Sequence, residues 1–243
     1  KLNKIGETEN LSKGEKMYST RFMGNKAYMV TYKNTDPLYV IDLSNPSTPE
    51  VLGKLKIPGY STYLHPYDEN HLIGIGMQTE EKVYKDSQGR VTSTTAVITG
   101  MKMALFDVSD VNNPKQISQT IIGDRRTTSA ILTNHKALLF SKEKGILAIP
   151  VNSYPSDFEI NLDTTDINSM VKAYSNYGKK YTKEGYFVYN INLEDGIKLK
   201  GIINHDKISV SNYYYSTSRL IRGIWIENNL FTISEDMIKV NNL

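Results

Sequence analysis

Hydrophobic and polar residues alternate in short runs along most of the chain, and polar turns separate the runs. The stretch from Asp36 to Gly59 shows this pattern, because two alternating apolar runs flank a turn that contains proline. Alternation of this kind is typical of β-strands that bury one face. The stretch from Met101 to Asp124 repeats the pattern, and Asp107 corresponds to Asp42 at an offset of 65 positions without a gap. We therefore interpret the two stretches as copies of one structural repeat.

A tight polar turn marks a further hairpin before each copy. Such turns lie at Gly24-Asn25 and Glu69-Asn70, with similar turns at Asn134-His135 and Asn228-Asn229. Four strands therefore make one repeat, and a four-stranded repeat of about 40 to 50 residues is typical of a β-propeller blade. The sequence predicts an all-β fold, a β-propeller with about four such blades. The expected blades span residues 15–57, 61–122 and 127–203, and residues 216–243 form three strands of a fourth.

Two insertions lengthen the repeats. The first, near residues 77–100, is rich in Val, Thr and Tyr on both sides of Ser87-Gln88-Gly89, which predicts an inserted hairpin. The second, from Asn152 to about Glu184, places Thr-Thr-Asp before apolar residues spaced three and four apart, with Gly178 after them. This pattern predicts a short helix near residues 165–177.

The two ends of the chain complement each other in strand number. Residues 1–6 are expected to supply a lone fourth strand, and residues 216–243 lack one. We therefore expect residues 1–243 to form a single β-propeller domain, closed into a ring of four blades, or a fragment of a larger propeller. The chain begins without Met and ends inside an apolar alternation, so we interpret it as a piece of a longer protein.

Several stretches resemble a known family. DPLYVIDLSNPSTPEVLGKLKIPG, IGDRR and KEKGILAIPV are similar to the bacterial family of secreted proteins with a C-terminal β-propeller domain that is distantly related to WD repeats. PLYVIDLSNPSTPEVLG also resembles the LVIVD-type repeat of surface propellers. The similarity runs from YSTRFMGNKAYMVTY to LFTISEDMIKV, nearly the whole chain. It implies a propeller fold and export, and it implies no catalytic residue because the family has no established reaction. Two departures from the pattern occur. Val111 stands where the first copy has Pro46, and NINLEDG lacks both prolines and the Asp that ends the third strand in the other copies.

The composition narrows the functional classes. The net charge is +3, and Lys and Arg are spread along the chain rather than gathered into the basic surface of a nucleic-acid-binding protein. No run approaches the roughly 18 apolar residues of a membrane span. The absence of cysteine removes disulfides and thiolate nucleophiles, and it favours an exported protein. We expect an extracellular or cell-surface location, with a protein or an envelope polysaccharide as the partner.

Catalytic and metal-binding patterns are weak. The histidines show no HxxH spacing, and no G-x-S-x-G motif occurs. We therefore predict no catalytic residue, no metal site and no cofactor. Calcium remains an alternative, because the stretches Asn190–Gly196 and Asp163–Asn168 are rich in hard oxygen ligands. Asp42 and Asp107 are better explained as acceptors of hydrogen bonds from the turn that follows each of them.

The candidate binding residues follow the fourth strands of the predicted blades. In propellers the loops that lead from one blade to the next gather around one mouth of the central channel. The candidates in these loops are Tyr60, His65, Asp124, Arg125 and Arg126. Arginine can bind a carboxylate or a phosphate through its planar fork. The alternative for the aspartate and its arginine neighbours is a local ion pair within the turn.

Two functional classes remain. The first is a non-catalytic binding or scaffold domain of an exported bacterial cell-surface or secreted protein. The second is a hydrolytic or carbohydrate-active propeller whose catalytic groups lie outside this piece. We favour the first class, because none of the motifs above supplies a complete catalytic set.

Overall fold

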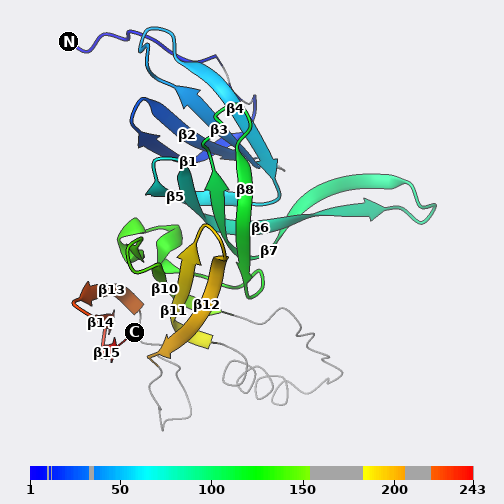
Figure 1. Ribbon diagram of the computed structural model, residues 1–243. Helices are drawn as coiled ribbons and strands as arrows, with labels where there is room; N and C mark the ends of the chain where they lie inside the picture. The colour runs from blue at the N-terminus through cyan, green and yellow to red at the C-terminus, as the bar shows by residue number, and fades with distance from the viewer. Residues whose placement is uncertain (10, 12, 33–35, 154–182, 206–219, 243) are drawn as a thin grey trace. The chain divides into compact units, whose positions relative to one another are not determined.

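The computed structural model describes residues 1–9, 11, 13–32, 36–153, 183–205 and 220–242 (Figure 1). Within these residues the fold is all-β, as predicted: the strands form four sheets, and the helices are two short 3-10 turns. Three sheets have four strands in sequential order, and the last sheet has three. The chain divides into two compact units, which we describe separately: residues 1–121 with 192–197, and residues 122–191 with 198–243.

The first unit contains the two repeats that align in sequence. One sheet comprises β1 (Lys16–Met23), β2 (Lys26–Tyr32), β3 (Asp36–Asp42) and β4 (Glu50–Ile57). The other comprises β5 (Tyr60–Asp68), β6 (His71–Lys85), β7 (Val91–Asp107) and β8 (Lys115–Ile122). Lys26 pairs with Asp42 in the first sheet, and His71 pairs with Asp107 in the second. This equivalent register confirms the internal repeat.

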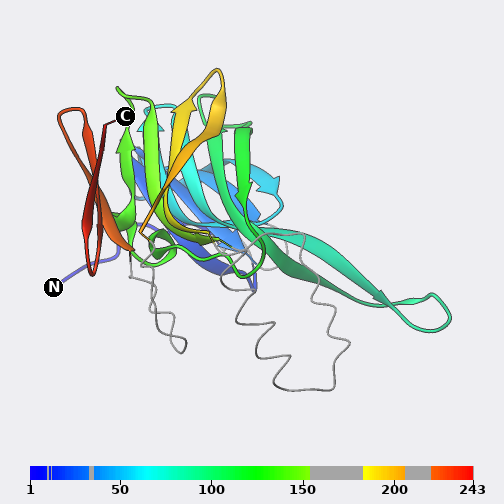
Figure 2. The same ribbon diagram turned by 90° about the horizontal axis from the view of Figure 1, so that it is seen from below.

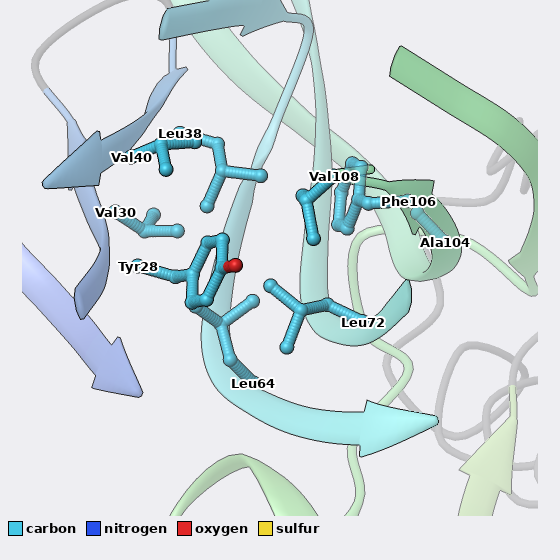
Figure 3. Close-up of a cluster of buried hydrophobic side chains, with 9 residues drawn as sticks. All are labelled: Tyr28, Val30, Leu38, Val40, Leu64, Leu72, Ala104, Phe106 and Val108. Carbon is cyan, nitrogen blue, oxygen red and sulfur yellow. The ribbon is translucent and has the colours of Figure 1, made fainter. Parts of the chain in front are cut away.

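A cluster of buried hydrophobic side chains joins these two sheets (Figure 3). Its members are Tyr28, Val30, Leu38 and Val40 from the first sheet, with Leu64, Leu72, Ala104, Phe106 and Val108 from the second repeat. Within a strand they lie two residues apart, as the alternating pattern requires for one buried face. Each large member contributes about 2 kcal/mol through burial, so the cluster fixes one sheet against the other.

Glycine allows β4 to approach the turn that follows β7. A Cβ atom at Gly53 would overlap the backbone oxygen of Val111, so a larger residue there requires the turn to move. Gly6 lies against Pro46 in the same manner, and Pro46 is the residue that corresponds to Val111 in the first repeat. The N-terminal segment therefore lies beside the first repeat in the position that β4 occupies beside the second.

The ends of the chain differ in part from the prediction. Residues 1–9 form no strand, so the lone strand expected at residues 1–6 is not observed. The last sheet has the three strands that were expected, β13 (Leu220–Ile226), β14 (Asn229–Ser234) and β15 (Ile238–Asn242). Closure of the sheets into a ring stays a prediction. The helix predicted near residues 165–177 lies outside the described residues.

The predicted inserted hairpin is present as an extension of β6 and β7 (Figures 1 and 2). Its strands pair from Gln78 opposite Gly100 to Lys85 opposite Val91. The Asp86 carboxylate closes the turn, because its Oδ1 accepts hydrogen bonds from the backbone amides of Gln88 and Arg90, each at 2.9 Å. A turn of this kind is a typical use of aspartate between two strands.

Most of the third sheet and the whole three-stranded sheet belong to the second unit. The third sheet comprises β9 (Leu139–Ser141), β10 (Ile146–Ser153), β11 (Lys183–Asn192) and β12 (Gly196–Asn204). Ile146, Ala148, Val188 and Leu230 form a buried cluster, so the third sheet packs against β14. Repeated sheets packed face to face are what a series of blades requires.

The prediction of a hairpin turn at Asn134-His135 is wrong. Residues 130–132 and 135–137 form the 3-10 turns η1 (Ala130–Leu132) and η2 (His135–Ala137), and the hairpin turn lies further on, between β9 and β10. Ser129 and Asn134 each accept a backbone amide hydrogen bond at the start of one of these turns. Such side-chain bonds stabilise a local turn in competition with strand pairing.

Candidate functional site

The aspartates that end the third strands are bound within their own turns. Asp42 Oδ1 accepts hydrogen bonds from the Ser44 amide at 2.9 Å and the Ser44 hydroxyl at 2.7 Å. Asp107 accepts the same two bonds from Ser109, at 2.9 and 2.6 Å. Bonds from the serine side chain and amide hold the pKa of each carboxyl below its ordinary value. The structural interpretation of both aspartates is therefore confirmed.

The third repeat uses asparagine for the same purpose. Asn192 Oδ1 accepts hydrogen bonds from the amides of Glu194 at 3.0 Å and Asp195 at 2.6 Å. The stretch Asn190–Gly196, one of the calcium candidates, thus contains an ordinary side-chain-closed turn. The other calcium candidate, at residues 163–168, lies outside the described residues, so calcium binding remains untested. In the part of the chain that is described, no three His, Asp or Glu residues form a group that could hold a metal ion.

His71 lies between two carboxylates beside the second of these turns. Its Nδ1 is 2.7 Å from Asp68 Oδ1, and its Nε2 is 4.0 Å from Asp107 Oδ1. In the first repeat, Lys26 holds the equivalent position opposite Asp42. A basic residue opposite the turn aspartate therefore recurs, and we assign His71 a structural role beside this turn.

The predicted loop residues of the second unit form a local ion pair. Arg126 donates from its amide to Asp124 Oδ1 at 2.8 Å, and from Nε and Nη2 to Oδ2 at 2.9 and 2.5 Å. Arg125 between them is exposed. The alternative given for these residues, an ion pair within the turn, is what the geometry shows, whereas a role of Arg125 in binding stays a prediction.

Tyr60, the first loop candidate of the first unit, belongs to an aromatic cluster. Its ring centroid lies 4.5 Å from that of Tyr18 and 4.6 Å from that of Tyr32. Burial, followed by the two neighbouring phenols, raises the pKa of Tyr60. Part of this side chain therefore stabilises the junction of β1, β2 and β5, and its partly exposed remainder is available to a partner.

His65, the second candidate, was predicted in a loop, but it lies within β5 beside Tyr63. The Tyr63 hydroxyl is 2.9 Å from His65 Nδ1. Burial, with a smaller contribution from the Arg21 charge, lowers the pKa of His65 to about 4. The imidazole is consequently neutral near pH 7, and the positive charge at this place comes from arginine alone.

Arg21 is the residue of this site that sequence reasoning missed. It lies on β1, which is tied to β5 by a hydrogen bond from the Ser19 hydroxyl to the Ser61 carbonyl at 2.8 Å. Two residues further along each strand lie Arg21 and Tyr63: burial raises the pKa of Tyr63, and the nearby Arg21 charge opposes part of this rise. The Arg21 Nε is buried and has no hydrogen-bond partner among the described residues. These groups come together only because β1 and β5, which belong to different sheets, lie side by side.

Lys102 supports the loop that leads into β5. Its side chain is 2% exposed, and its ammonium group donates to the Pro58 carbonyl at 2.5 Å. The Thr79 hydroxyl accepts a bond from the Gly59 amide at 2.9 Å. A buried lysine with such a bond fixes the backbone before Tyr60, and we assign it a structural role.

A cleft of about 560 Å³ lies around the turn between β1 and β2. Its lining includes Lys26, Asp42 and Glu69. The lining carries one basic and two acidic side chains, and one of the acidic residues, Asp42, is already engaged by Ser44. The cleft therefore gives a weaker indication of a ligand than the unpartnered Nε of Arg21.

The repeated four-stranded sheets define the class of β-propeller proteins. The sequence matches the family described as beta propeller domain over residues 1–243, and the chain belongs to this family. Among the described residues, no helix has the length and apolar character needed to cross a membrane.

Two archaeal proteins are similar to this chain. An uncharacterized protein of Methanocaldococcus jannaschii is 43% identical over 159 residues, 65% of this chain and 22% of that protein. An uncharacterized protein of Archaeoglobus fulgidus is 37% identical over 150 residues, 62% of this chain and 21% of that protein. The match thus spans about a fifth of the length of these curated relatives. Because both are archaeal and uncharacterized, the bacterial, secreted and LVIVD-type parts of the resemblance stay predictions.

Solved structures give a distant likeness. The computationally designed Ika4 protein has a TM-score of 0.43 and 13% identity, over 97% of this chain and 96% of that chain. A mutant of Synechocystis apocarotenoid oxygenase has a TM-score of 0.38 and 10% identity, over 96% of this chain and 51% of that chain. Likeness at this level carries no conclusion about activity.

Proposed function

We propose that this chain is a non-catalytic binding domain of an exported protein, and that it binds an acidic polysaccharide of the cell envelope. The observation that carries the proposal is the buried Nε of Arg21, which has no hydrogen-bond partner among the described residues. Buried charges in proteins are as a rule paired and hydrogen-bonded. A carboxylate of a ligand would supply the missing partner.

The neighbours of Arg21 favour a carboxylate over a cation or a neutral group. His65 is neutral near pH 7 because its pKa is about 4, and Tyr63 carries no charge either, so the local charge is that of the guanidinium. Charge-assisted hydrogen bonds between arginine and a carboxylate contribute about 1.5 to 3 kcal/mol. The site is therefore suited to a ligand with a negative group.

Tyrosines along the same pair of strands favour a sugar polymer. Tyr18 and Tyr60 pack together where β1 and β5 begin, and both are partly exposed. Aromatic rings offer flat apolar faces with a polar hydroxyl, which suits the ring of a sugar. An acidic protein segment is the competing partner, and the experiment below distinguishes the two.

Binding to a galacturonate oligosaccharide, measured by isothermal titration calorimetry, tests the proposal. We expect binding to the wild-type chain and a loss of about tenfold or more in the Arg21→Met variant, because a charge-assisted bond disappears. The Arg222→Met variant removes an equally charged but exposed arginine from the second unit, and it should bind like the wild type. A neutral dextran and a polyglutamate peptide complete the series.

The outcomes separate the alternatives. Equal binding by wild type and the Arg21→Met variant, or no binding to any anionic probe, would contradict the proposal. Binding to polyglutamate without binding to galacturonate would make the partner an acidic protein. Release of new reducing ends from the oligosaccharide would instead favour a carbohydrate-active enzyme.

A further inference from the structure

The hairpin formed by the ends of β6 and β7 extends beyond the strands that flank it in the second sheet (Figure 2). On one side, β5 begins at Tyr60, which pairs with Met77 of β6. On the other side, β8 is compared with β4 of the first repeat, whose last residue Ile57 pairs with Asp36, the first residue of β3. Asp36 corresponds to Met101 at the repeat offset of 65, so the same register lets β8 extend along β7 only as far as Met101. In the described part of the chain, both edges of the hairpin beyond these points therefore lack a neighbouring strand.

The two free edges differ in charge. Four of the eight residues from Gln78 to Lys85 on β6 are charged: Glu80, Glu81, Lys82 and Lys85. The stretch from Val91 to Thr99 on β7 has no charged residue, no proline and no glycine, and it consists mainly of Val, Ile and Thr. Charged residues on an edge strand oppose pairing with another strand, and their absence permits it. The β7 edge is thus the one suited to accept a further strand.

The hairpin has the exposed apolar surface that a further strand would help to cover. Val83 is 48% exposed, Val91 59% and Ile98 37%. A two-stranded hairpin is only marginally stable in water, and a sheet gains independent stability from three or more strands. An additional strand beside β7 would bring Val91 and Ile98 of that strand next to new neighbours.

We infer that the β7 edge pairs with the same edge of a second copy of this chain. An uncharged edge gives no attraction to a charged segment, whereas a second copy offers an uncharged strand of equal length and equal strand-forming tendency. A two-fold axis perpendicular to the sheet makes the two β7 strands antiparallel, in the order β6–β7–β7–β6.

The sequence around Thr95 is compatible with this symmetric pairing. When Thr95 lies opposite its own copy, Ala96 lies opposite Thr94 and Val97 lies opposite Ser93. Residues opposite one another then share a face of the sheet, and no like charges meet. Pairs between Thr, Ser and Val residues are favourable across antiparallel strands.

Sedimentation velocity over a concentration series tests the inference on the 243-residue chain. We expect a reversible dimer for the wild type. The double variant Thr94→Lys, Thr95→Lys places like charges opposite one another, so its dimer should dissociate at concentrations at least about tenfold higher. The variant Val83→Lys adds a charge to β6 of the same hairpin and should remain dimeric. Melting temperatures measured in parallel show that each variant is folded.

Disulfide trapping gives an independent readout, because the chain has no cysteine. Mild oxidation of the Thr95→Cys variant should yield a covalent dimer, and the Val83→Cys variant should yield much less. A wild-type chain that is monomeric throughout overturns the inference, as does a dimer that the lysine pair leaves unchanged. Equal cross-linking by both cysteine variants also overturns it, since the contact would then lack the proposed register.

Discussion

Charged residues are hydrogen-bonded differently in two regions of the first unit. One region comprises the turns after the third strands, and the other is the contact between β1 and β5. In the turns, Asp42 and Asp107 are each bound by the serine two positions on, and a basic residue lies opposite in the sheet. Between β1 and β5, the Arg21 Nε is buried and has no hydrogen-bond partner among the described residues. The aspartates therefore find their hydrogen-bond partners within the fold, whereas the Arg21 Nε would gain a partner from a ligand.

This difference separates residues that maintain the fold from residues that are candidates for function. The turn aspartates recur in sequence and attract attention first, but a satisfied carboxylate has little capacity left for a partner. Arg21 occurs once and belongs to no motif, yet its buried Nε lacks an acceptor among the described residues. Substitutions of both kinds of residue should therefore affect stability differently.

The Gly53→Ala substitution should have the largest effect on stability. The new Cβ would overlap the Val111 carbonyl oxygen, so β4 or the turn after β7 must shift, at a cost of about 2 to 3 kcal/mol. Urea unfolding of the purified chain measures this cost. Gly201→Ala is the control, because no atom lies within 4 Å of a Cβ placed there. A variant at Gly53 as stable as the control would show that this turn is not a packing element.

His65 should make the folded state less stable in acid. Burial and the Arg21 charge lower its pKa to about 4, whereas the unfolded value is about 6.5. Between these values the unfolded chain binds a proton that the folded chain does not, so stability falls as the pH drops from about 6.5 to 4. Allowing for partial exposure, we expect a loss of about 2 kcal/mol.

Unfolding free energies of the wild type and the His65→Gln variant at pH 7 and pH 4.5 measure this loss as a difference. His135→Gln, which alters an exposed histidine in η2, should follow the wild type. An identical pH dependence in the wild type and the His65→Gln variant would contradict a partly buried, neutral imidazole at His65.

Removal of a turn carboxylate should have a moderate effect. Asp107→Ala loses two hydrogen bonds from Ser109 and should lower the free energy of unfolding by about 1 kcal/mol. Asp107→Asn keeps an acceptor oxygen and should recover most of that stability, as Asn192 does in the third repeat. Thermal unfolding of both variants is the measurement. If Asp107→Asn lowered the free energy of unfolding as much as Asp107→Ala, the negative charge of Asp107 would contribute more to stability than its hydrogen bonds within the turn.

Arg21→Met should change the stability least. The substitution removes a partly buried charge without an ion pair and leaves an apolar side chain of similar length, an exchange that is often neutral or slightly stabilising. We expect a shift of at most about 0.5 kcal/mol, measured in the absence of any ligand. A large loss of stability would mean that Arg21 maintains the fold, and the contrast with the turns would disappear.

The repeat could be predicted from the sequence because it is local. Asp42 and Asp107 stand after apolar runs and before proline- or serine-containing turns, and this order fixes the third and fourth strands. The segment after Ser129 was assigned wrongly to a strand, since a short apolar run does not distinguish a strand from a capped 3-10 turn. Arg21 could not be found from the sequence, because its site depends on a contact between strands of two different repeats.

The pKa of His65, followed by NMR with and without a saturating galacturonate oligosaccharide, shows whether a ligand carboxylate binds Arg21. Part of the lowering of this pKa comes from the Arg21 charge. A carboxylate bound to Arg21 should offset that charge and raise the pKa of His65 above about 4, and the Arg21→Met variant should show no such response to the ligand. A His65 pKa that stays the same when the ligand is bound would place the ligand elsewhere and contradict the account.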